Sequence, residues 1–276
     1  MSEIRHQKTN FTNIFWLMDN KKVVEHIVSW LTNYVETSGT QGFVIGISGG
    51  IDSAVTSTLC ALTGKKVIVL NMPIRQFKTE FDRSNEHIEW LQQNFSNVEA
   101  DKVDLTSALE NLETIFPKQI QDFLTMANTR ARLRMISLYA FATHHKLLVA
   151  GTGNKVEDFG VGFFTKYGDG GVDLSPIADL YKTQVYDLAK ELGVVNSIQA
   201  ARPTDGLFPD GRTDEDQIGA SYPELEWAME YIERKENKEL SLREKEVLEI
   251  YSKRNRINQH KVNPIPVCII PKHLKA

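Results

Sequence analysis

Apolar residues along this chain follow two spacings. Continuous, β-branched runs of strand length stand at 42–47, 65–72, 97–105 (in part) and 146–152. Apolar residues that recur every third or fourth position, as on one helix face, mark 21–39, 52–63, 79–95, 118–143 and 176–193. Because strands alternating with helices indicate a parallel sheet with helices on both faces, we predict an α/β fold with an open, mostly parallel sheet.

The alternation stops near residue 200. Residues 201–217, "ARPTDGLFPDGRTDEDQ", form a turn-rich stretch, and two further helical patterns at 222–236 and 241–255 precede a proline-containing tail. No repeat or linker divides the chain. We expect one domain over residues 1–276: an N-terminal arm (1–20), an α/β core (21–200) and a loop with a helical C-terminal extension (201–276).

Composition and charge narrow the class of protein. The chain has 276 residues, 32 Lys and Arg against 36 Asp and Glu, and a formal net charge of -4. A general nucleic-acid binder is usually basic, so this balance argues against one. No apolar run approaches the roughly 20 residues that span a bilayer. The two cysteines, Cys60 and Cys268, have no metal or disulfide spacing, and we expect a cytoplasmic protein without nucleic-acid or membrane partners.

The most informative short stretch is "VIGISGGIDSAV", residues 44–55, where a strand runs into a glycine turn and then a helix. Gly49 and Gly50 allow positive φ and leave room for an oxyanion, and the N–H groups of the turn and helix can bind it. Asp52 beside an anion suggests a bridging Mg²⁺. A plain strand-to-helix turn remains an alternative. The Walker lysine is absent, which disfavours kinases and GTPases of that type.

The segment Ser48–Ser53 resembles the signature of the N-type ATP pyrophosphatases, which cleave ATP between its α and β phosphates. A second segment, "GFFTKYGDGGVDLSP" at 162–176, is similar to the NAD synthetase family. Matching pieces follow the family's order along the chain: "NTRARLRM", "GTGNKVE", "DLYKTQV", "RPTDGL", "TDEDQIG" and "QHK". The resemblance as a whole covers about residues 20–262. The resemblance implies an adenine nucleotide alpha hydrolase-like fold.

The resemblance also implies roles for individual residues. Binding of ATP is implied for Gly46, Ile47, Ser48, Gly49, Gly50, Ile51, Asp52, Ser53, Thr152, Lys182 and Thr204. Binding of Mg²⁺ is implied for Asp52 and Glu157. Contacts with deamido-NAD are implied for Arg132, Lys166, Asp173, His260 and Lys261. Asp52 and Lys166 are expected to act in catalysis, with Lys166 neutralising charge on the α-phosphate.

Simpler interpretations stand beside several of these roles. A glutamate such as Glu157 near a helix start is often a solvated cap. His260 and Lys261 could belong to an exposed tail. Tyr34 and Tyr139 occupy positions where the family places aromatics near the pyridine ring, but Tyr34 also lies on a helical apolar stripe. The "GTGNKV" run lacks the third glycine of a dinucleotide fingerprint, so that interpretation is weak.

The implied reaction is an ATP-dependent amidation of deamido-NAD through an acyl-adenylate, with release of AMP and pyrophosphate. Two alternatives stay open: another ligase with this loop, such as a GMP synthetase-like or tRNA-modifying enzyme, and a nucleotide-binding protein without turnover. About 45 residues precede the loop, too few for a glutamine amidase domain, so we expect free ammonia as the nitrogen source.

The resemblance implies a homodimer whose dinucleotide site borders the subunit interface. The glycine-rich segment 160–172 and the turn-rich segment 204–216 are predicted to order over the ligands as lids that exclude water. Phe163, Phe164, Leu207 and Phe208 are expected to provide their apolar cover.

Overall fold

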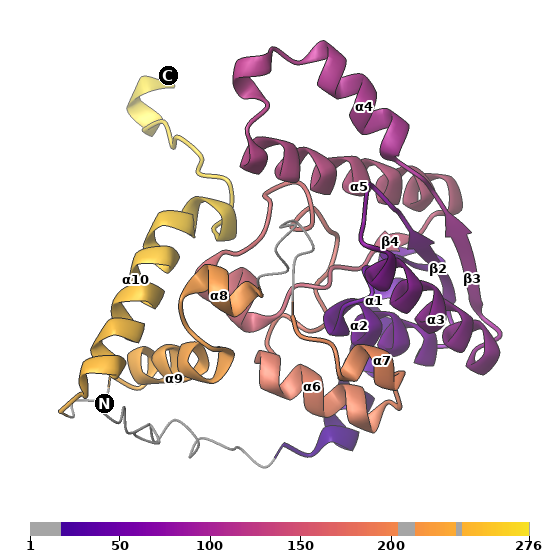
Figure 1. Cartoon of the computed structure of the whole chain (residues 1–276), viewed down its shortest axis with the longest axis horizontal. Coiled ribbons are helices and arrows are strands. Elements are labelled where there is room, and N and C mark those ends of the chain that lie inside the picture. Colours follow the sequence, from indigo (N-terminus) through magenta and orange to yellow (C-terminus); the bar gives the residue numbers. More distant parts are fainter. Residues whose placement is uncertain (1–17, 204–212, 236–238, 276) are drawn as a thin grey trace, which may run out of the picture.

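Four parallel strands form the sheet, in the order β3-β2-β1-β4 (Figure 1). Their bounds are Gly42–Gly46 for β1, Lys66–Asn71 for β2, Val98–Lys102 for β3 and Leu148–Val149 for β4. This architecture comes from a computed structural model that describes residues 18–203, 213–235 and 239–275. The predicted α/β fold with an open parallel sheet is confirmed.

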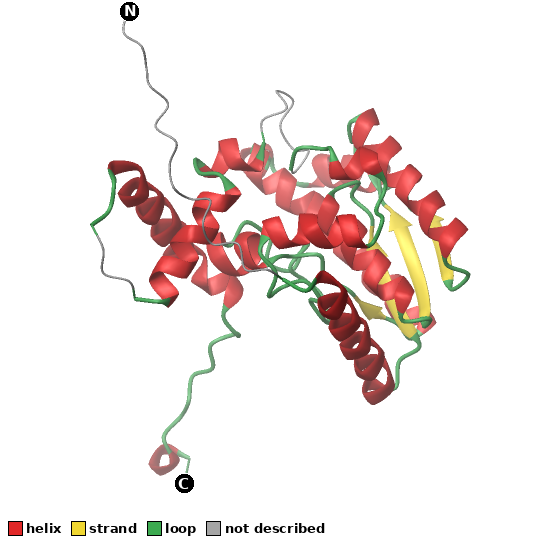
Figure 2. Ribbon diagram, turned by 90° about the horizontal axis from the view of Figure 1, so that it is seen from below, coloured by secondary structure: helices red, strands yellow, loops and turns green. Residues whose placement is uncertain are grey.

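Alternating side chains of the strands build two apolar layers. Phe43 and Ile45 of β1 enter a core cluster on one face, whereas Val44 enters another cluster on the opposite face. The first face is covered by α1 (Asn20–Ser38), α2 (Ile51–Leu62) and α6 (Lys182–Glu191). The second is covered by α5 (Phe123–His145). Figure 2 shows helices on either side of the sheet. Burial on both faces explains why β1 and β2 are almost continuously apolar, whereas the edge strand β3 is largely exposed and carries charged residues.

The helices predicted at 52–63 and 79–95 are α2 and α3 (Lys78–Asn94). The long helix predicted at 118–143 begins later, because Asp122 caps α5 by accepting a hydrogen bond from Thr125 N at 3.0 Å. Only a short 3-10 turn, Lys118–Ile120, precedes it. The helix predicted at 176–193 likewise starts at Lys182, as α6. Helices α4 (Thr106–Ile115) and α7 (Asn196–Gln199) were not predicted.

The C-terminal extension contains α8 (Asp214–Ile218), α9 (Tyr222–Glu233) and α10 (Leu242–Val262). The last helix extends well past the predicted end at 255, so His260 and Lys261 lie in its final turn and not in a tail. The extension packs against the π-helix Lys155–Val161, labelled η3. Val156 and Val161 of η3 are fully buried among side chains of α9 and α10.

The strand order places a switch point between β1 and β4. The chain leaves β1 toward β2 on one side and reaches β4 on the other, so the loops after these two strands diverge. Ligands of open parallel sheets bind in the crevice at such a point. None of the helices in the described residues has the length and apolar character needed to cross a membrane.

Candidate functional site

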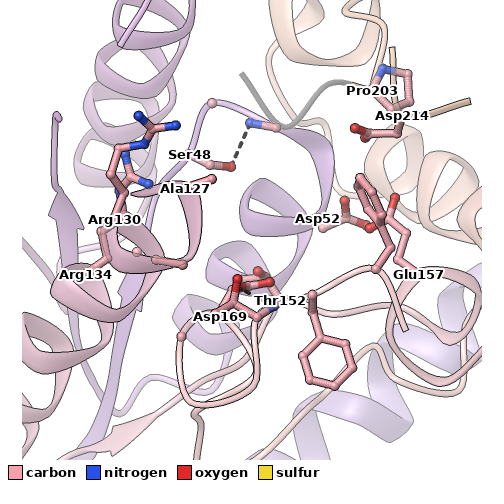
Figure 3. Close-up of a pocket in the computed structure, with 18 of the residues that line it drawn as sticks. Ser48, Asp52, Ala127, Arg130, Arg134, Thr152, Glu157, Asp169, Pro203 and Asp214 are labelled. Carbon is pink, nitrogen blue, oxygen red and sulfur yellow. Dashed lines mark hydrogen bonds between the residues drawn. The ribbon is translucent and has the colours of Figure 1, made fainter. Parts of the chain in front are cut away.

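A cavity of about 1080 Å³ opens at the carboxyl ends of β1 and β4 (Figure 3). Residues 46–52 form one wall, Gly151 and Thr152 follow β4, and α5 forms the opposite wall. Lys182 of α6 and Glu157 of η3 also line the cavity. The cavity therefore lies at the switch point, which is where the topology predicts a ligand.

The glycine loop, residues 46–52, has a backbone conformation suited to binding an anion. Gly49 has φ 81°, and a Cβ at this position would lie 2.6 Å from the carbonyl oxygen of Glu80. Gly50 is the N-cap of α2, and no side chain caps the helix there. The first N–H groups of α2 thus lack a capping side chain and favour a negatively charged ligand.

Helix α3 fixes this loop from outside. Ser84 Oγ donates to Ile47 O at 2.8 Å, and Arg83 Nε donates to Gly49 O at 3.2 Å. Ser53 braces it from inside: its hydroxyl donates to Gly50 O at 3.0 Å, and the side chain is almost fully buried. Residues 46–52 line the cavity, whereas Ser53 lies behind them. Ser53 therefore shapes the loop and does not supply a hydroxyl to the cavity.

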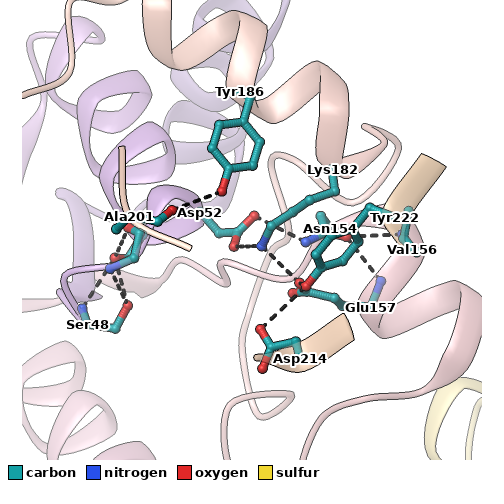
Figure 4. Close-up of polar contacts among 12 residues, drawn as sticks. Ser48, Asp52, Asn154, Val156, Glu157, Lys182, Tyr186, Ala201, Asp214 and Tyr222 are labelled. Atoms are coloured by element: carbon teal, nitrogen blue, oxygen red, sulfur yellow. Dashed lines mark hydrogen bonds and ion pairs between the residues drawn. The ribbon is translucent and has the colours of Figure 1, made fainter. Parts of the chain in front are cut away.

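Two carboxylates meet at a single ammonium group (Figure 4). Lys182 Nζ lies 2.5 Å from Asp52 Oδ2 and 2.8 Å from Glu157 Oε1. The lysine side chain is 4% exposed, and the aspartate and glutamate side chains are 17% and 15% exposed. The sequence predicted that Asp52 and Glu157 lie together as metal ligands. In the structure the two carboxylates lie together, on either side of the Lys182 ammonium group.

Asn154 connects the segments that carry the two carboxylates. Its Nδ2 donates to Asp52 Oδ1 at 3.1 Å, and its Oδ1 accepts the N–H groups of Val156 and Glu157 at 3.1 and 3.0 Å. The asparagine is completely buried. It caps η3 and at the same time holds Asp52, so it fixes the spacing between the two acids.

The electrostatics follow from burial and from the ammonium group. Burial raises the pKa of Asp52, and the attraction of Lys182 only partly offsets it. Burial also acts to raise the pKa of Glu157, but the charge and hydrogen bond of Lys182, with the hydroxyl of Tyr222, lower it overall. The pKa of Lys182 is raised because the two carboxylates outweigh its burial. The lysine therefore stays charged.

Two arginines of α5 face the cavity across from the carboxylates (Figure 3). Arg134 Nε donates to Met72 O at 3.1 Å, at the end of β2. Burial lowers its pKa to about 10, so it remains charged at neutral pH. Arg130 lies one turn away on the same helix and also lines the cavity. This wall suits a polyanion that extends from the glycine loop.

Four of the five residues expected to contact deamido-NAD lie close together at the surface: Arg132, Lys166, His260 and Lys261. Arg132 Nη2 donates to Lys166 O at 3.3 Å, and the Lys166 ammonium group donates to the carbonyl oxygen of His260. Lys261 Nζ donates to Gly162 O and Phe164 O at 2.7 and 2.8 Å. Lys261 lines the cavity, whereas the side chains of the other three lie outside it. Lys166 is thus not brought into the cavity in this structure.

Asp173 is exposed and bonded to the protein: Tyr139 donates to its Oδ1 at 3.0 Å and Val149 N to its Oδ2 at 2.8 Å. Tyr34 is 38% exposed on α1 and does not line the cavity. Thr204, Leu207 and Phe208 lie outside the described residues, so their predicted roles are not tested.

Several residues of the site were not predicted from the sequence. Asn154 was visible as the residue after "GTG", but its capping role depended on the unexpected π-helix. Arg134 is one of three arginines that alternate along α5. Which of them face the cavity depends on the rotation of the helix about its axis, which the sequence does not give. Tyr222, whose hydroxyl donates to Glu157, lies 65 residues from it and carried no sequence signal.

Comparisons with known proteins agree with this geometry. Residues 23–264 match the family model for NAD synthase. The chain is 36% identical over 259 residues to the NH(3)-dependent NAD(+) synthetase of Methanosarcina acetivorans, covering 91% of this chain and 98% of the relative. It is 41% identical over 207 residues to the enzyme of that name from Mycoplasma genitalium, covering 74% and 81% of the two chains.

Solved structures give the same result. The NMN synthetase of Francisella tularensis superposes with a TM-score of 0.80 at 32% identity, covering 92% of this chain and 99% of that one. The NH3-dependent NAD synthetase of Campylobacter jejuni superposes with a TM-score of 0.75 at 27% identity, covering 91% and 100%. Because the family model matches most of the chain, the chain belongs to the NAD synthase family.

Proposed function

We propose that this protein is a ligase of NAD biosynthesis that amidates deamido-NAD with ammonia, using ATP and releasing AMP and pyrophosphate. The observation that carries the proposal is the pairing of Asp52 and Glu157 beside the glycine loop, at the switch point of the sheet. Relatives named as NH(3)-dependent NAD(+) synthetases, at 36% and 41% identity, support the reaction.

The donor set fits a magnesium ion. One atom, Lys182 Nζ, already lies within 2.8 Å of both carboxylates, so a single cation can contact both. Among the described residues no three or more His, Cys, Asp and Glu side chains gather as a metal site. Mg²⁺ often takes only one or two carboxylates and completes its shell with water and phosphate oxygens. We propose that Asp52 and Glu157 hold it, and that it would neutralise charge on the phosphates.

The protein's own residues supply the remaining functions. The N–H groups at Gly49 and the start of α2 would bind the departing pyrophosphate. Lys182 lies beside the two carboxylates in the structure and would donate to the phosphates of ATP when ATP is bound. Thr152 and Lys182 contact ATP. Such chemistry depends on positioning and charge, and it needs no side-chain nucleophile.

The surface cluster of Arg132, Lys166, His260 and Lys261, with Asp173, is proposed to bind the dinucleotide in a homodimer. It lies mostly outside the cavity, as expected if a second subunit completes it. Exposed apolar side chains on α5 and beyond α10 support an interface there: Leu124, Ile136, Ile265, Val267 and Ile269, which are 60–80% exposed.

A second candidate substrate has a specific observation behind it. A structure with a TM-score of 0.80 is named NMN synthetase, so amidation of nicotinate mononucleotide is the alternative acceptor reaction. Both acceptors present the same pyridine carboxylate and differ in the adenylate part. The surface cluster would bind that part, so it decides between them.

One set of assays tests the function. AMP formation is measured with ATP, Mg²⁺ and ammonium, adding deamido-NAD, nicotinate mononucleotide, xanthosine monophosphate or no acceptor. We expect turnover with deamido-NAD and ammonium, and none with purified glutamine. Turnover with xanthosine monophosphate would favour a GMP synthetase-like enzyme. Absence of AMP with every acceptor would favour a nucleotide-binding protein without turnover.

The cysteine usage, with Cys60 and Cys268 both free, supports a cytoplasmic location.

A further inference from the structure

The hydroxyl of Tyr222 reaches the carboxylate pair from the C-terminal extension (Figure 4). Tyr222 is the first residue of α9, and its side chain is nearly fully buried. Its hydroxyl donates a hydrogen bond to Glu157 Oε1, and Lys182 Nζ lies 5.2 Å from the centre of its ring. The tyrosine thus contacts the glutamate and the lysine of the site without lining the cavity.

The bonds to Glu157 are unequally distributed over its two oxygens. Tyr222 and Lys182 both bind Oε1, and neither of them binds Oε2. Two donors at one oxygen restrict rotation of the carboxylate and leave the second oxygen outside these bonds. When Lys182 moves to the phosphates, the bond from Tyr222 keeps the carboxylate oriented. Metal ligands generally need such an outer partner to fix their orientation.

Tyr222 is itself held in place by neighbouring elements. Its backbone N–H donates to Glu215 Oε1 of α8 at 2.7 Å, and Ser221 caps α9 together with Glu224. The ring belongs to the apolar cluster that joins η3 to α9 and α10. Packing alone would account for the buried ring, but a phenylalanine would pack equally well and place no hydroxyl on Glu157.

We propose that Tyr222 is a positioning residue for the metal-binding carboxylate of Glu157, and that the C-terminal extension thereby sets the metal affinity of the sheet site. The proposal deepens the function proposed above and rests on its assignment of Mg²⁺ to Asp52 and Glu157. Outer partners of metal ligands typically change metal affinity by roughly 10- to 100-fold.

The experiment compares Tyr222→Phe with a matched control, Tyr181→Phe. Tyr181 is also buried, and its hydroxyl donates to Glu230 Oε1 at 2.7 Å, so the control removes the same kind of bond within the same apolar cluster. Binding of Mn²⁺, as a spectroscopic replacement for Mg²⁺, is measured by electron paramagnetic resonance with α,β-methylene-ATP present. The Mg²⁺ concentration for half-maximal AMP formation is measured in parallel.

We expect Tyr222→Phe to weaken Mn²⁺ binding about tenfold or more. It should raise the half-saturating Mg²⁺ concentration by the same factor and leave kcat at saturating Mg²⁺ near the parental value. Tyr181→Phe should leave both metal measurements unchanged. If Tyr222→Phe proves insoluble, Tyr222→Met removes the same hydroxyl and must show the same loss.

Parental Mn²⁺ affinity in Tyr222→Phe would overturn the proposal. Equal weakening in both phenylalanine variants would also overturn it, because the effect would then reflect loosening of the cluster. A lower kcat at unchanged metal affinity would be a third contrary result. If the parental protein amidates neither pyridine acceptor, the proposed function fails, but the Mn²⁺ measurement still decides the role of Tyr222.

Discussion

The replacement Lys182→Met tests the electrostatics of the site most directly. It removes a cation that is 4% exposed and bonded to two carboxylates, while keeping a side chain of similar length. Removing one partner of a buried ion pair typically costs about 3–5 kcal/mol, because the remaining charge is buried without compensation. Asp52 and Glu157 retain 17% and 15% exposure toward the cavity, so we expect the lower end, about 3 kcal/mol.

The assay is chemical and thermal unfolding at pH 7.5 in EDTA, with a matched control on the same helix. For a chain of this length, about 3 kcal/mol corresponds to a decrease in Tm of roughly 5 °C. Lys190 of α6 pairs with Asp187 at 3.0 Å, but its side chain is 66% exposed. Lys190→Met should therefore cost less than about 1 kcal/mol. Addition of Mg²⁺ should stabilise Lys182→Met more than the parent, because the ion replaces the missing positive charge.

The pH dependence gives a second test with a definite sign. Without the ammonium group both carboxyls of the variant should have a pKa above the unfolded values near 4. A folded-state pKa that is raised gives stability that is present at low pH and is lost as the pH increases through it. The difference between variant and parent should thus shrink as the pH falls toward 4. A parental free energy of unfolding at pH 7.5, or a loss that does not depend on pH, would refute the reasoning.

Other consequences of the structure can be measured as directly. Asp52→Asn and Glu157→Gln should each lower AMP formation by about 100-fold or more at saturating Mg²⁺, with circular dichroism unchanged; near-parental turnover would contradict the metal assignment. Gly49→Ala should weaken ATP binding and cost about 1–2 kcal/mol of stability from φ 81° alone, measured by calorimetry and unfolding. Light scattering at micromolar concentration should give a dimer mass, and an active monomer would rule the dimer out. In hydrogen exchange, amides of 160–172 should gain protection when ATP and deamido-NAD are added. Lys261→Met removes the hydrogen bonds from the ammonium group to Gly162 O and Phe164 O, so it should speed the exchange of these amides.

The sequence predicted the sheet and its binding edge because both depend on local patterns. A β-branched run followed by glycines identifies β1 and the loop after it, whatever packs around them. Family motifs then placed Asp52, Glu157 and Lys182 in one site, and the structure brings the three together. Asp52, Glu157 and Lys182 each belong to a short sequence motif, and such a motif can be recognised without knowing how the chain folds.

What the sequence did not reveal depends on register and on distant contacts. The π-helix η3 has one extra residue per turn, stabilised by the Asn154 cap, and no hydrophobic period marks it. The inward position of Arg134 follows from how α5 packs on β1. The length of α10 was underestimated, since its polar surface hides the few contacts that extend it, such as the bond from Asn258 to Val161 O.

The two carboxylates belong to helices that pack in different apolar clusters. Helix α2, with Asp52, is buried against the sheet, whereas η3, with Glu157, is buried against α9 and α10. The spacing between the acids therefore depends on how these two packed units meet. Lys182 and Asn154 both bond across that junction. If Lys182 contacts the phosphates of ATP, as proposed, Asn154 and the packing of the extension are left to keep the spacing. A substitution deep in the C-terminal cluster is thus expected to change the spacing of the two acids, and with it the proposed metal site, without contacting either carboxylate.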